Sequence, residues 1–309
     1  MEIEYIGICF ISGQALFKGI VMIKAVMVDL DGTLLNDNKE ISKHTVDTIL
    51  EFQEKGGLFV VNTGRGYATA SKFLKEVGIS CDYICLSGAA TYTADGACVM
   101  QDVMDKKEVE IIRNLEKKYH LYVNYLTSKG ALSEITYEML KGYYLHEAHM
   151  REAYCDVSEG ELLKPYANIL SYVQYEINID EVIAEGLPIY KMVLMSMDLE
   201  VLEEVKKELA QYSDFAVAWT SKSSCEVNAS RVNKGQAALV YMVAKDIDMQ
   251  ELMVIGDSEN DISMLKMSFG KTVAMANADE SIKNICSDVT LSNNEDGVAY
   301  AMEQWAWKE

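Results

Sequence analysis

An apolar run that ends directly in acidic residues is the strongest constraint on the fold of this chain. Residues 23–28 read I-K-A-V-M-V, and D-L-D-G-T follows at residues 29–33. A short run of apolar, partly β-branched residues is typical of a buried strand. Ligands of open α/β sheets bind just beyond the carboxyl ends of strands. The pattern therefore predicts a functional site immediately after the first strand.

The acids after this strand also approach the spacing of a calcium-binding EF-hand loop. Positions 1, 3, 5, 9 and 12 of such a loop would be Asp29, Asp31, Thr33, Asp37 and Glu40. The loop needs a glycine at position 6, where this chain has Leu34. It also follows a helix, whereas the run before Asp29 has the pattern of a strand. The sequence therefore favours a strand-end site over an EF-hand.

Strand and helix patterns alternate through the N-terminal part of the chain. Strands are expected at Leu58–Val61 and Tyr83–Leu86, and helices from Ser42 to Gly56 and from about Tyr67 to Val77. Asp95-Gly96 then predicts a hairpin turn. Alternation of this kind indicates an α/β fold, a doubly wound parallel sheet with helices on both faces.

The pattern changes near residue 105, and the alternation resumes near Cys225. Between them lie long helical stretches and strands expected at Ile189–Met195 and Phe215–Trp219. After them come a helix at Lys234–Val243 and a strand at Leu252–Ile255. We therefore predict a core in two parts, residues 22–104 and 222–309, interrupted by an inserted α/β domain at residues 105–221. Because Met22 stands directly before the first strand, residues 1–21 are expected to be a dispensable N-terminal extension.

Composition narrows the classes of partner. The 309 residues include 48 acids and 28 bases, a formal net charge of −20. Binding to nucleic acid needs clustered Lys and Arg, so that partner is not expected. No apolar run approaches the roughly 18–20 residues that span a bilayer. The seven cysteines are scattered and form no C-x-x-C pair, which predicts reduced thiols in a cytoplasmic protein.

Four short motifs are expected at strand ends or helix starts of the core. They are D-L-D-G-T from Asp29, N-T-G-R from Asn62, V-N-K-G around Lys234, and G-D-S-E-N-D from Gly256. Asp29 and Asp257 come from different strand ends and can converge on one Mg²⁺, which prefers oxygen ligands and a substrate phosphate. Together the motifs predict chemistry on a phosphate group.

The same residues offer each part of phosphoryl transfer. A carboxylate at Asp29 can attack phosphorus, and Asp31 can protonate the leaving oxygen and later take a proton from water. Thr63 and nearby backbone N–H groups can hold phosphoryl oxygens, while Lys234 can balance the charge of the transition state. Phosphoryl transfer needs mainly positioning and charge stabilisation, which this set supplies.

These motifs resemble those of the haloacid-dehalogenase superfamily, and in detail its Cof-type phosphatases with a type IIB cap. The resemblance covers residues 22–309 and includes V-A-M-A-N-A-D-E-S-I-K and N-N-E-D-G-V-A near the C-terminus. It implies a Rossmann-like core with an α/β cap inserted between the second and third motifs. One departure is Ser87, in S-G-A, where the group often has asparagine.

The resemblance also implies individual roles. Asp29 would be the nucleophile that forms an aspartyl-phosphate, and Asp31 the general acid and base. Mg²⁺ would be held by the Asp29 side chain, the Asp31 backbone carbonyl and Asp257. The phosphate contacts would come from the Leu30 N–H, Thr63, Gly64, Lys234 and Asn260. Asp261 would orient Lys234 or a metal-bound water rather than bind the metal.

The leading hypothesis is a Mg²⁺-dependent phosphatase of small phosphorylated metabolites, above all sugar phosphates. Asp31 favours a phosphatase or phosphomutase, because dehalogenases lack an acid there and P-type ATPases carry threonine. A phosphomutase of the phosphomannomutase type and a non-catalytic phosphate-ligand binding protein stay open as alternatives. In each case the inserted segment is expected to choose the substrate.

Overall fold

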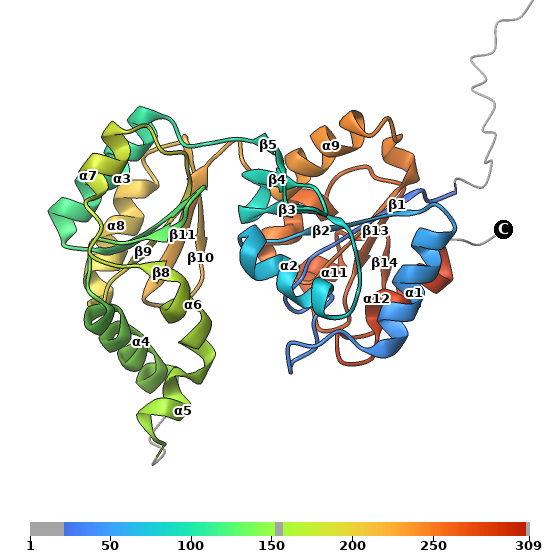
Figure 1. The fold of residues 1–309 in the computed structure, drawn as a ribbon, viewed down its shortest axis with the longest axis horizontal. Helices are drawn as coiled ribbons and strands as arrows, with labels where there is room; N and C mark the ends of the chain where they lie inside the picture. The colour runs from blue at the N-terminus through green and yellow to red at the C-terminus, as the bar shows by residue number, and fades with distance from the viewer. Residues whose placement is uncertain (1–21, 152–156, 307–309) are drawn as a thin grey trace, which may run out of the picture.

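The strands of the described residues form two separate sheets (Figure 1). The computed structural model describes residues 22–151 and 157–306. The expected extension at residues 1–21 lies outside the described residues. The first sheet has the order β14-β13-β12-β1-β2-β3-β4-β5, and the second has the order β10-β11-β9-β6-β7-β8.

The first sheet is built from both ends of the chain. Its strands are β1 (Ala25–Val28), β2 (Leu58–Asn62), β3 (Asp82–Cys85), β4 (Ala90–Tyr92), β5 (Cys98–Gln101), β12 (Leu252–Gly256), β13 (Lys271–Ala274) and β14 (Asp288–Val289). Neighbouring strands from β14 to β3 run parallel, and β4 and β5 add an antiparallel edge. The central strand β1 lies between β12 and β2, so residues that follow these three strands meet at one edge.

Helices cover both faces of this sheet. They are α1 (Lys43–Glu54), α2 (Tyr67–Glu76), α9 (Lys234–Ala244), α10 (Ile262–Leu265), α11 (Glu280–Lys283) and α12 (Gly297–Trp305). Alternate residues of β1 enter different cores. Val26 and Val28 pack with α1, α2 and α12, and Ala25 and Met27 pack with α9, α10 and α11. This arrangement confirms the predicted doubly wound α/β fold.

Local signals in the sequence account for the helix start and the hairpin. The Ser42 hydroxyl accepts a hydrogen bond from the Thr45 N–H at 3.1 Å and caps α1. Gly56, with φ +87°, follows the end of that helix. Asp95 and Gly96 lie in the turn between the antiparallel strands β4 and β5, as predicted, and Gly96 has φ +94°.

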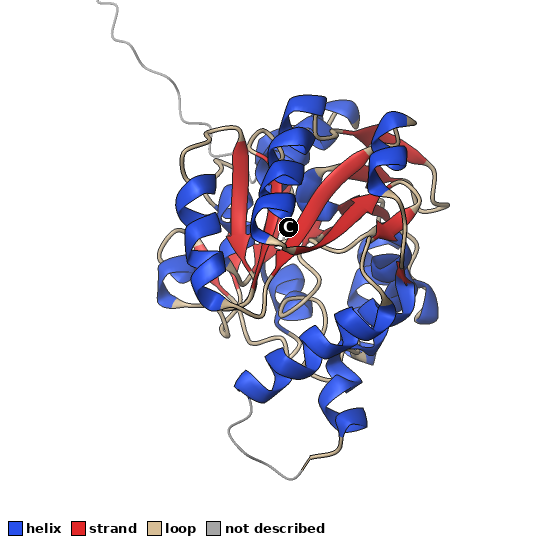
Figure 2. Cartoon of the chain, turned by 90° about the vertical axis from the view of Figure 1, so that its left-hand side faces the viewer, coloured by secondary structure: helices blue, strands red, loops and turns tan. Residues whose placement is uncertain are grey.

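The second sheet belongs to the middle of the chain. Its strands are β6 (Tyr122–Thr127), β7 (Gly130–Leu132), β8 (Val173–Gln174), β9 (Ile189–Met195), β10 (Phe215–Trp219) and β11 (Ser224–Ala229). Its helices are α3 (Lys106–Tyr119), α4 (Tyr137–Arg151), α5 (Glu159–Leu163), α6 (Ala167–Tyr172), α7 (Ile179–Ala184) and α8 (Leu199–Leu209). Helices α3 and α8 pack on one face of the sheet, and α4 and α6 pack on part of the other (Figure 2).

The last strand of the second sheet runs past the predicted domain boundary at 221/222. Strand β11 pairs with β9 and β10, and its apolar residues Cys225 and Val227 lie in the core beneath α3 and α8. A short strand of this kind suits either sheet, so the sequence could not assign it. We propose that the inserted unit extends from residue 105 through Ala229.

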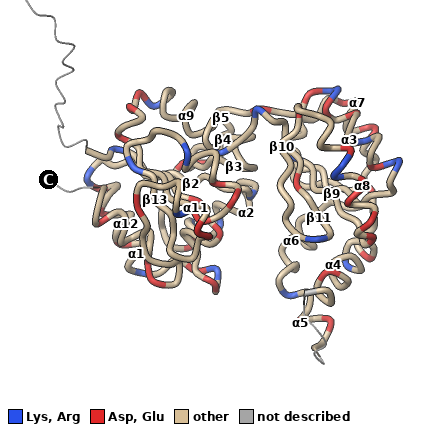
Figure 3. The backbone as a smooth tube through the Cα atoms, turned by 180° about the vertical axis from the view of Figure 1, so that it is seen from behind, with Lys and Arg blue, Asp and Glu red and all other residues tan. Residues whose placement is uncertain are grey.

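The positions of the charged residues, the helix lengths and the cysteines bear on the classes of partner considered above. Acidic residues occur on both parts of the molecule rather than on one face (Figure 3). Among the helices formed by residues 22–151 and 157–306, none is both long and apolar enough to cross a membrane. The cysteines in these ranges are free thiols, at positions 81, 85, 98, 225 and 286.

Arg231 joins the two segments that connect the sheets. It lies between β11 and α9, and its partners lie between β5 and the first turn of α3. Its guanidinium donates to the Asp102 carboxylate at 2.9 Å, the Val103 carbonyl at 2.6 Å and the Glu108 carboxylate at 2.6 Å. Glu108 is only 4 % exposed, so it depends on this partner for charge compensation.

Replacing Arg231 by methionine should therefore lower the melting temperature by about 2–5 °C, because Glu108 loses a charged hydrogen bond. Differential scanning fluorimetry measures the shift. The matched control is Lys107→Met, which breaks an exposed ion pair with Asp214 and should cost less than about 1 °C. Equal melting temperatures for the two variants would contradict the account.

Candidate active site

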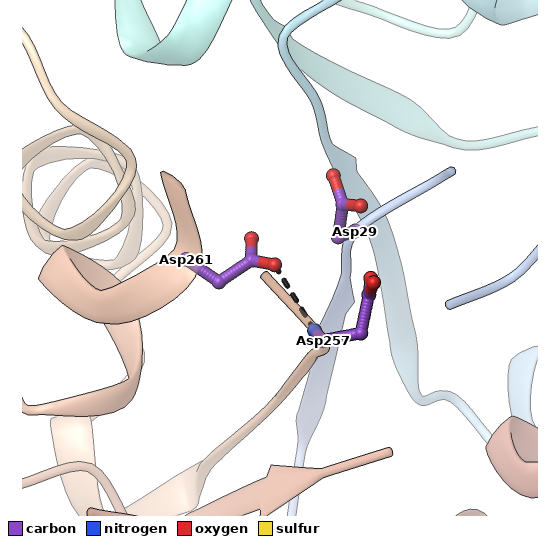
Figure 4. A group of neighbouring side chains, drawn as sticks. All are labelled: Asp29, Asp257 and Asp261. Atoms are coloured by element: carbon purple, nitrogen blue, oxygen red, sulfur yellow. Dashed lines mark hydrogen bonds between the residues drawn. The ribbon is translucent and has the colours of Figure 1, made fainter. Parts of the chain in front are cut away.

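The acids predicted to form a site meet at the carboxyl edge of the first sheet. Asp29 follows β1 and Asp257 follows β12, while Asp261 comes from the turn after Asp257. Figure 4 shows the three side chains turned toward a common space. One carboxylate oxygen of each lies within 4.8 Å of the others. Parallel pairing of β1 with β12 places these carboxylates together.

Lys234 holds two of these acids in place. It is the first residue of α9, and its side chain is 0 % exposed. Its ammonium donates to Asp29 Oδ1, to Asp261 Oδ1 at 2.7 Å and to Asn260 Oδ1 at 3.3 Å. Asp29 and Asp261 are thus buried with a charged partner, which a buried charge requires.

Asp257 is fixed by the turn after β1. The Thr33 hydroxyl donates to Asp257 Oδ1 at 2.7 Å. Gly32 has φ +82°, and a Cβ atom there would lie 2.5 Å from Asp257 Oδ2. Glycine is therefore needed at this position of D-L-D-G-T for two reasons: the backbone is left-handed there, and a side chain would collide with the Asp257 carboxylate.

Asp261 already uses both of its oxygens. Oδ1 accepts from Lys234, and Oδ2 accepts from the backbone N–H groups of Asp257 and Ser258 at 3.1 Å each. Asn260 receives a second hydrogen bond from the Ser258 hydroxyl at 2.8 Å. These contacts fix the turn that presents Asp257.

Burial and like charge set the electrostatics of the cluster. Burial raises the pKa of Asp29 to about 7, although Lys234 lowers it, and Asp261 raises it again. Burial likewise raises the pKa of Asp257 to about 6. Burial alone would lower the pKa of Lys234, but Asp261 and Asp29 raise it above its ordinary value. The site is therefore short of positive charge.

The cluster fits a divalent cation. Within the described chain, the Oδ1 atoms of Asp29 and Asp257 have hydrogen-bond donors, and their Oδ2 atoms stay open to a ligand. Three carboxylates against one ammonium leave two negative charges, which a divalent ion would cancel. An all-oxygen donor set suits Mg²⁺, Ca²⁺ or Mn²⁺ rather than softer metals.

Asp31 lies apart from these contacts and is paired with two cations. Arg65 donates to its carboxylate through Nε at 2.5 Å and Nη2 at 2.6 Å, and Lys39 donates at 2.9 Å. Burial alone would raise the pKa of Asp31, but Arg65 and Lys39 lower it below its ordinary value. The residue predicted to be the acid and base is therefore ionised in this state.

The N-T-G-R turn after β2 lies beside the turn after β3. Thr63 is 1 % exposed, its hydroxyl accepts from the Arg65 N–H at 3.2 Å, and its carbonyl accepts from the Ser87 N–H at 3.0 Å. Leu86 and Ser87 have φ +54° and +61°, values that are uncommon for residues other than glycine. The position where the related group often has asparagine is thus left-handed, which asparagine tolerates better than serine.

The structure brings most of the predicted residues to one edge of the sheet. Asp29, Asp257, Asp261, Lys234 and Asn260 form one network of contacts. The side chain of Leu30 is buried in the core, so only its backbone can face a ligand. An EF-hand loop is absent from this segment, because a strand precedes it, Asp37 binds Asn293 and Asn294, and Thr33 binds Asp257.

Three polar residues at the site were not assigned from the sequence. Arg65 and Thr33 lie inside the motifs, so their positions in the sequence could have identified them as candidate site residues. Lys191 comes from β9 of the second sheet, and its ammonium donates to the Gly64 carbonyl at 3.3 Å. A single lysine in the apolar strand I-Y-K-M-V-L-M was the available signal.

Comparisons with known proteins match nearly the whole chain. A family profile described as haloacid dehalogenase-like hydrolase matches residues 26–302. The Bacillus subtilis phosphatase YwpJ is 29 % identical, and the match covers 91 % of this chain and 99 % of that protein. The 5-amino-6-(5-phospho-D-ribitylamino)uracil phosphatase YwtE of the same organism is 28 % identical, covering 91 % and 97 %. The solved structure of a haloacid dehalogenase-like hydrolase from B. subtilis is 28 % identical, covering 91 % and 99 %, with a TM-score of 0.76.

Replacing Lys234 by methionine should lower the free energy of unfolding by about 3–5 kcal/mol, since Asp29 and Asp261 lose a buried counter-ion. Urea denaturation near neutral pH measures the loss. Lys245→Met is the control, because Lys245 is 39 % exposed and binds Asp82 at 2.9 Å; it should cost at most about 1 kcal/mol. Similar losses for both variants would show that the buried cluster is not held by Lys234.

Addition of Mg²⁺ should raise the melting temperature more at about pH 8 than at about pH 5.5. The raised pKa values of Asp29 and Asp257 mean that the folded protein holds extra protons between about pH 4 and 7. Metal-free stability therefore falls as the pH rises through that range, and a cation restores it by binding the ionised acids. Thermal scans with and without Mg²⁺ at both pH values measure the effect.

The control for this measurement is Asp257→Asn, which should remove most of the Mg²⁺ effect at both pH values. A Mg²⁺ shift that is the same at both pH values in the unaltered protein would rule out these carboxylates as the cation site.

Proposed function

The chain belongs to the haloacid dehalogenase-like hydrolase family, and on that premise we propose that it is a Mg²⁺-dependent phosphatase of small phosphorylated metabolites. The observation that carries the proposal is Asp29 at the end of the central strand, with one oxygen held by Lys234 and the other open beside Asp257. The names of YwpJ and YwtE, both phosphatases, support the same reaction class.

In the first step, Asp29 would attack the phosphorus atom of a phosphate monoester. The ester P–O bond breaks, the leaving alcohol departs, and an aspartyl-phosphate forms. Lys234 favours the ionised form of the attacking carboxylate against the effect of burial and holds it in a fixed orientation, and its charge stabilises the added negative charge of the transition state. Mg²⁺ held by Asp29, Asp257 and the Asp31 carbonyl would supply further charge compensation for the phosphoryl group.

Asp31 would protonate the departing oxygen and then take a proton from the water that attacks the aspartyl-phosphate. Asp31 is paired with Arg65 and Lys39, so these ion pairs must break before its carboxylate takes up a proton. We propose that the phosphate of an arriving substrate competes for the Arg65 guanidinium, which is well suited to bidentate binding of phosphate.

The remaining predicted residues would bind phosphoryl oxygens. Thr63 contributes a hydroxyl, and Leu30 and Gly64 contribute backbone N–H groups. The Asn260 side-chain N–H groups would complete this set, since its carbonyl oxygen is already taken by Lys234 and Ser258. Hydrogen-bond donors that are held in place before the reaction stabilise the charge of the transition state. This stabilisation supplies most of the rate enhancement in phosphoryl transfer.

Sugar phosphates and related hydroxylated esters are the substrate class that we propose. The name of YwtE gives a substrate with a phosphorylated ribityl chain, which belongs to this class. A cytoplasmic location, where such metabolites occur, is part of the proposal.

Release of inorganic phosphate from a panel of phosphorylated sugars, nucleotides and cofactors tests the proposal. We expect Mg²⁺-dependent release, and loss of at least about 10³-fold in Asp29→Asn. The matched control is Asp47→Asn, which removes an exposed carboxylate on α1 that pairs with Lys43, and it should keep full activity.

Full activity of Asp29→Asn would end the proposal. Conversion of one sugar phosphate into an isomer without phosphate release would show a phosphomutase instead. Binding of the panel compounds without any turnover would show a phosphate-ligand binding protein.

A further inference from the structure

Two sequence patterns near the C-terminus have no role in the proposed reaction. They are V-A-M-A-N-A-D-E-S-I-K at residues 273–283 and N-N-E-D-G-V-A at residues 293–299. The first begins in β13 and the second follows β14, two neighbouring strands of the first sheet. Both patterns contribute asparagine side chains that bind the loop at residues 32–40.

Asn277 fixes the backbone directly after Asp31. Its side-chain N–H donates to the Gly32 carbonyl at 2.8 Å, and its Oδ1 accepts from the Asn293 N–H at 3.0 Å. The carbonyl of the residue that follows Asp31 is therefore tied to the segments after β13 and β14.

Asn293 fixes the backbone directly before Asp31, and it does so through Leu35. Its side-chain N–H donates to the Leu35 carbonyl at 3.0 Å. The Leu35 N–H in turn donates to the Leu30 carbonyl at 2.8 Å, and Leu35 forms an isolated β-bridge with Asp31. The backbone on both sides of Asp31 is thus held by contacts that lead to an asparagine side chain.

The tip of the same loop is held through Asp37. Its carboxylate accepts from the side-chain N–H groups of Asn293 at 3.2 Å and Asn294 at 2.9 Å, and its own N–H donates to Asn294 Oδ1 at 3.1 Å. Lys39 of this tip has φ +62°, and its ammonium donates to the Asp31 carboxylate at 2.9 Å. Because the tip is exposed, polar contacts of this kind rather than apolar packing fix it.

Asp31 needs such support more than Asp29 does. The Asp29 side chain is 4 % exposed and is held by Lys234, whereas the Asp31 side chain is 37 % exposed. In the proposed reaction Asp31 also releases its cations, so its backbone has to keep the carboxylate in place. A general acid must lie about 2.6–3.2 Å from the oxygen that it protonates. A misplacement of about 1 Å can lower the rate about 10²-fold.

We propose that Asn277, Asn293 and Asn294 are positioning residues for the step in which the leaving oxygen is protonated. They tie the loop at residues 32–40 to the segments after β13 and β14. This asparagine brace keeps the Asp31 carboxylate within reach of the leaving oxygen while the P–O bond breaks and the proton is transferred. The inference rests on the proposed function, because it takes Asp31 to be the general acid.

A matched pair of phosphate esters isolates the protonation step. 4-Nitrophenyl phosphate releases a weakly basic phenolate that can leave without a proton, whereas phenyl phosphate releases a more basic one that gains more from protonation. The quantity to measure is kcat/KM, because it excludes the later hydrolysis of the aspartyl-phosphate. Asp31→Asn removes the acid and should lower kcat/KM at least about tenfold more for phenyl phosphate than for 4-nitrophenyl phosphate.

Variants of the asparagine brace should show the same selectivity. We expect Asn293→Ala and Asp37→Ala to lower kcat/KM at least about fivefold more for phenyl phosphate than for 4-nitrophenyl phosphate. Asp37 is exposed, so its variant keeps the test valid if Asn293→Ala does not fold. Asn294→Ala should add no further loss to Asp37→Ala, since both changes remove the same contact. The control Asn284→Ala, at an exposed asparagine after α11, should change either value by less than about twofold.

Equal losses for the two esters, or no loss, would overturn the inference, because a general disturbance of the fold does not select by leaving group. Full additivity of Asp37→Ala and Asn294→Ala would overturn it as well.

If the unaltered protein cleaves neither ester, hydrogen exchange decides. The backbone amides of residues 31–40 should exchange at least about tenfold faster in Asp37→Ala than in Asn284→Ala. Equal exchange would overturn the inference. The phosphate-release panel decides separately whether the proposed function fails.

Discussion

The ion pairs of Lys234 with Asp29 and Asp261 are the interaction on which the site depends. Three carboxylates gather at the carboxyl edge of a parallel sheet whose two faces are covered, and two of them, Asp29 and Asp261, are buried. Repulsion among them would open this edge if no cation were fixed nearby. Because Lys234 is the first residue of α9, the same helix that covers one face of the sheet also places the cation.

The shortage of positive charge at this edge is what suits it to phosphoryl transfer. Lys234 balances only part of the acidic charge, so Asp29 and Asp257 each keep an open oxygen for a divalent ion. The second sheet contributes groups of a different kind, a buried Lys191 paired with a partly exposed Glu226 and an Asn124 that has no hydrogen-bond partner among the described residues.

The sequence predicted the parts of this arrangement that depend on local patterns. Short patterns of neighbouring residues predicted the strands and helices of the first sheet. The same patterns placed Asp29, Thr63 and Asp257 at the ends of strands or the starts of helices. Pairings between distant segments could not be predicted in this way. The Gly64 carbonyl that accepts a hydrogen bond from Lys191 is 127 positions away from it, and the pairing of Asp31 with Arg65 depends on how two turns face each other. Strand β11 follows the predicted boundary at 221/222 but pairs within the second sheet, and its alternating residues would fit either sheet.

Chemical trapping of the reaction intermediate tests the central claim most directly. Borohydride added during turnover reduces an aspartyl-phosphate to an alcohol, and peptide mass spectrometry locates the altered residue. The account predicts that the side chain at position 29 is reduced, and only when both substrate and Mg²⁺ are present. Continued turnover with Asp29 unchanged, or reduction of a different carboxylate, would contradict it.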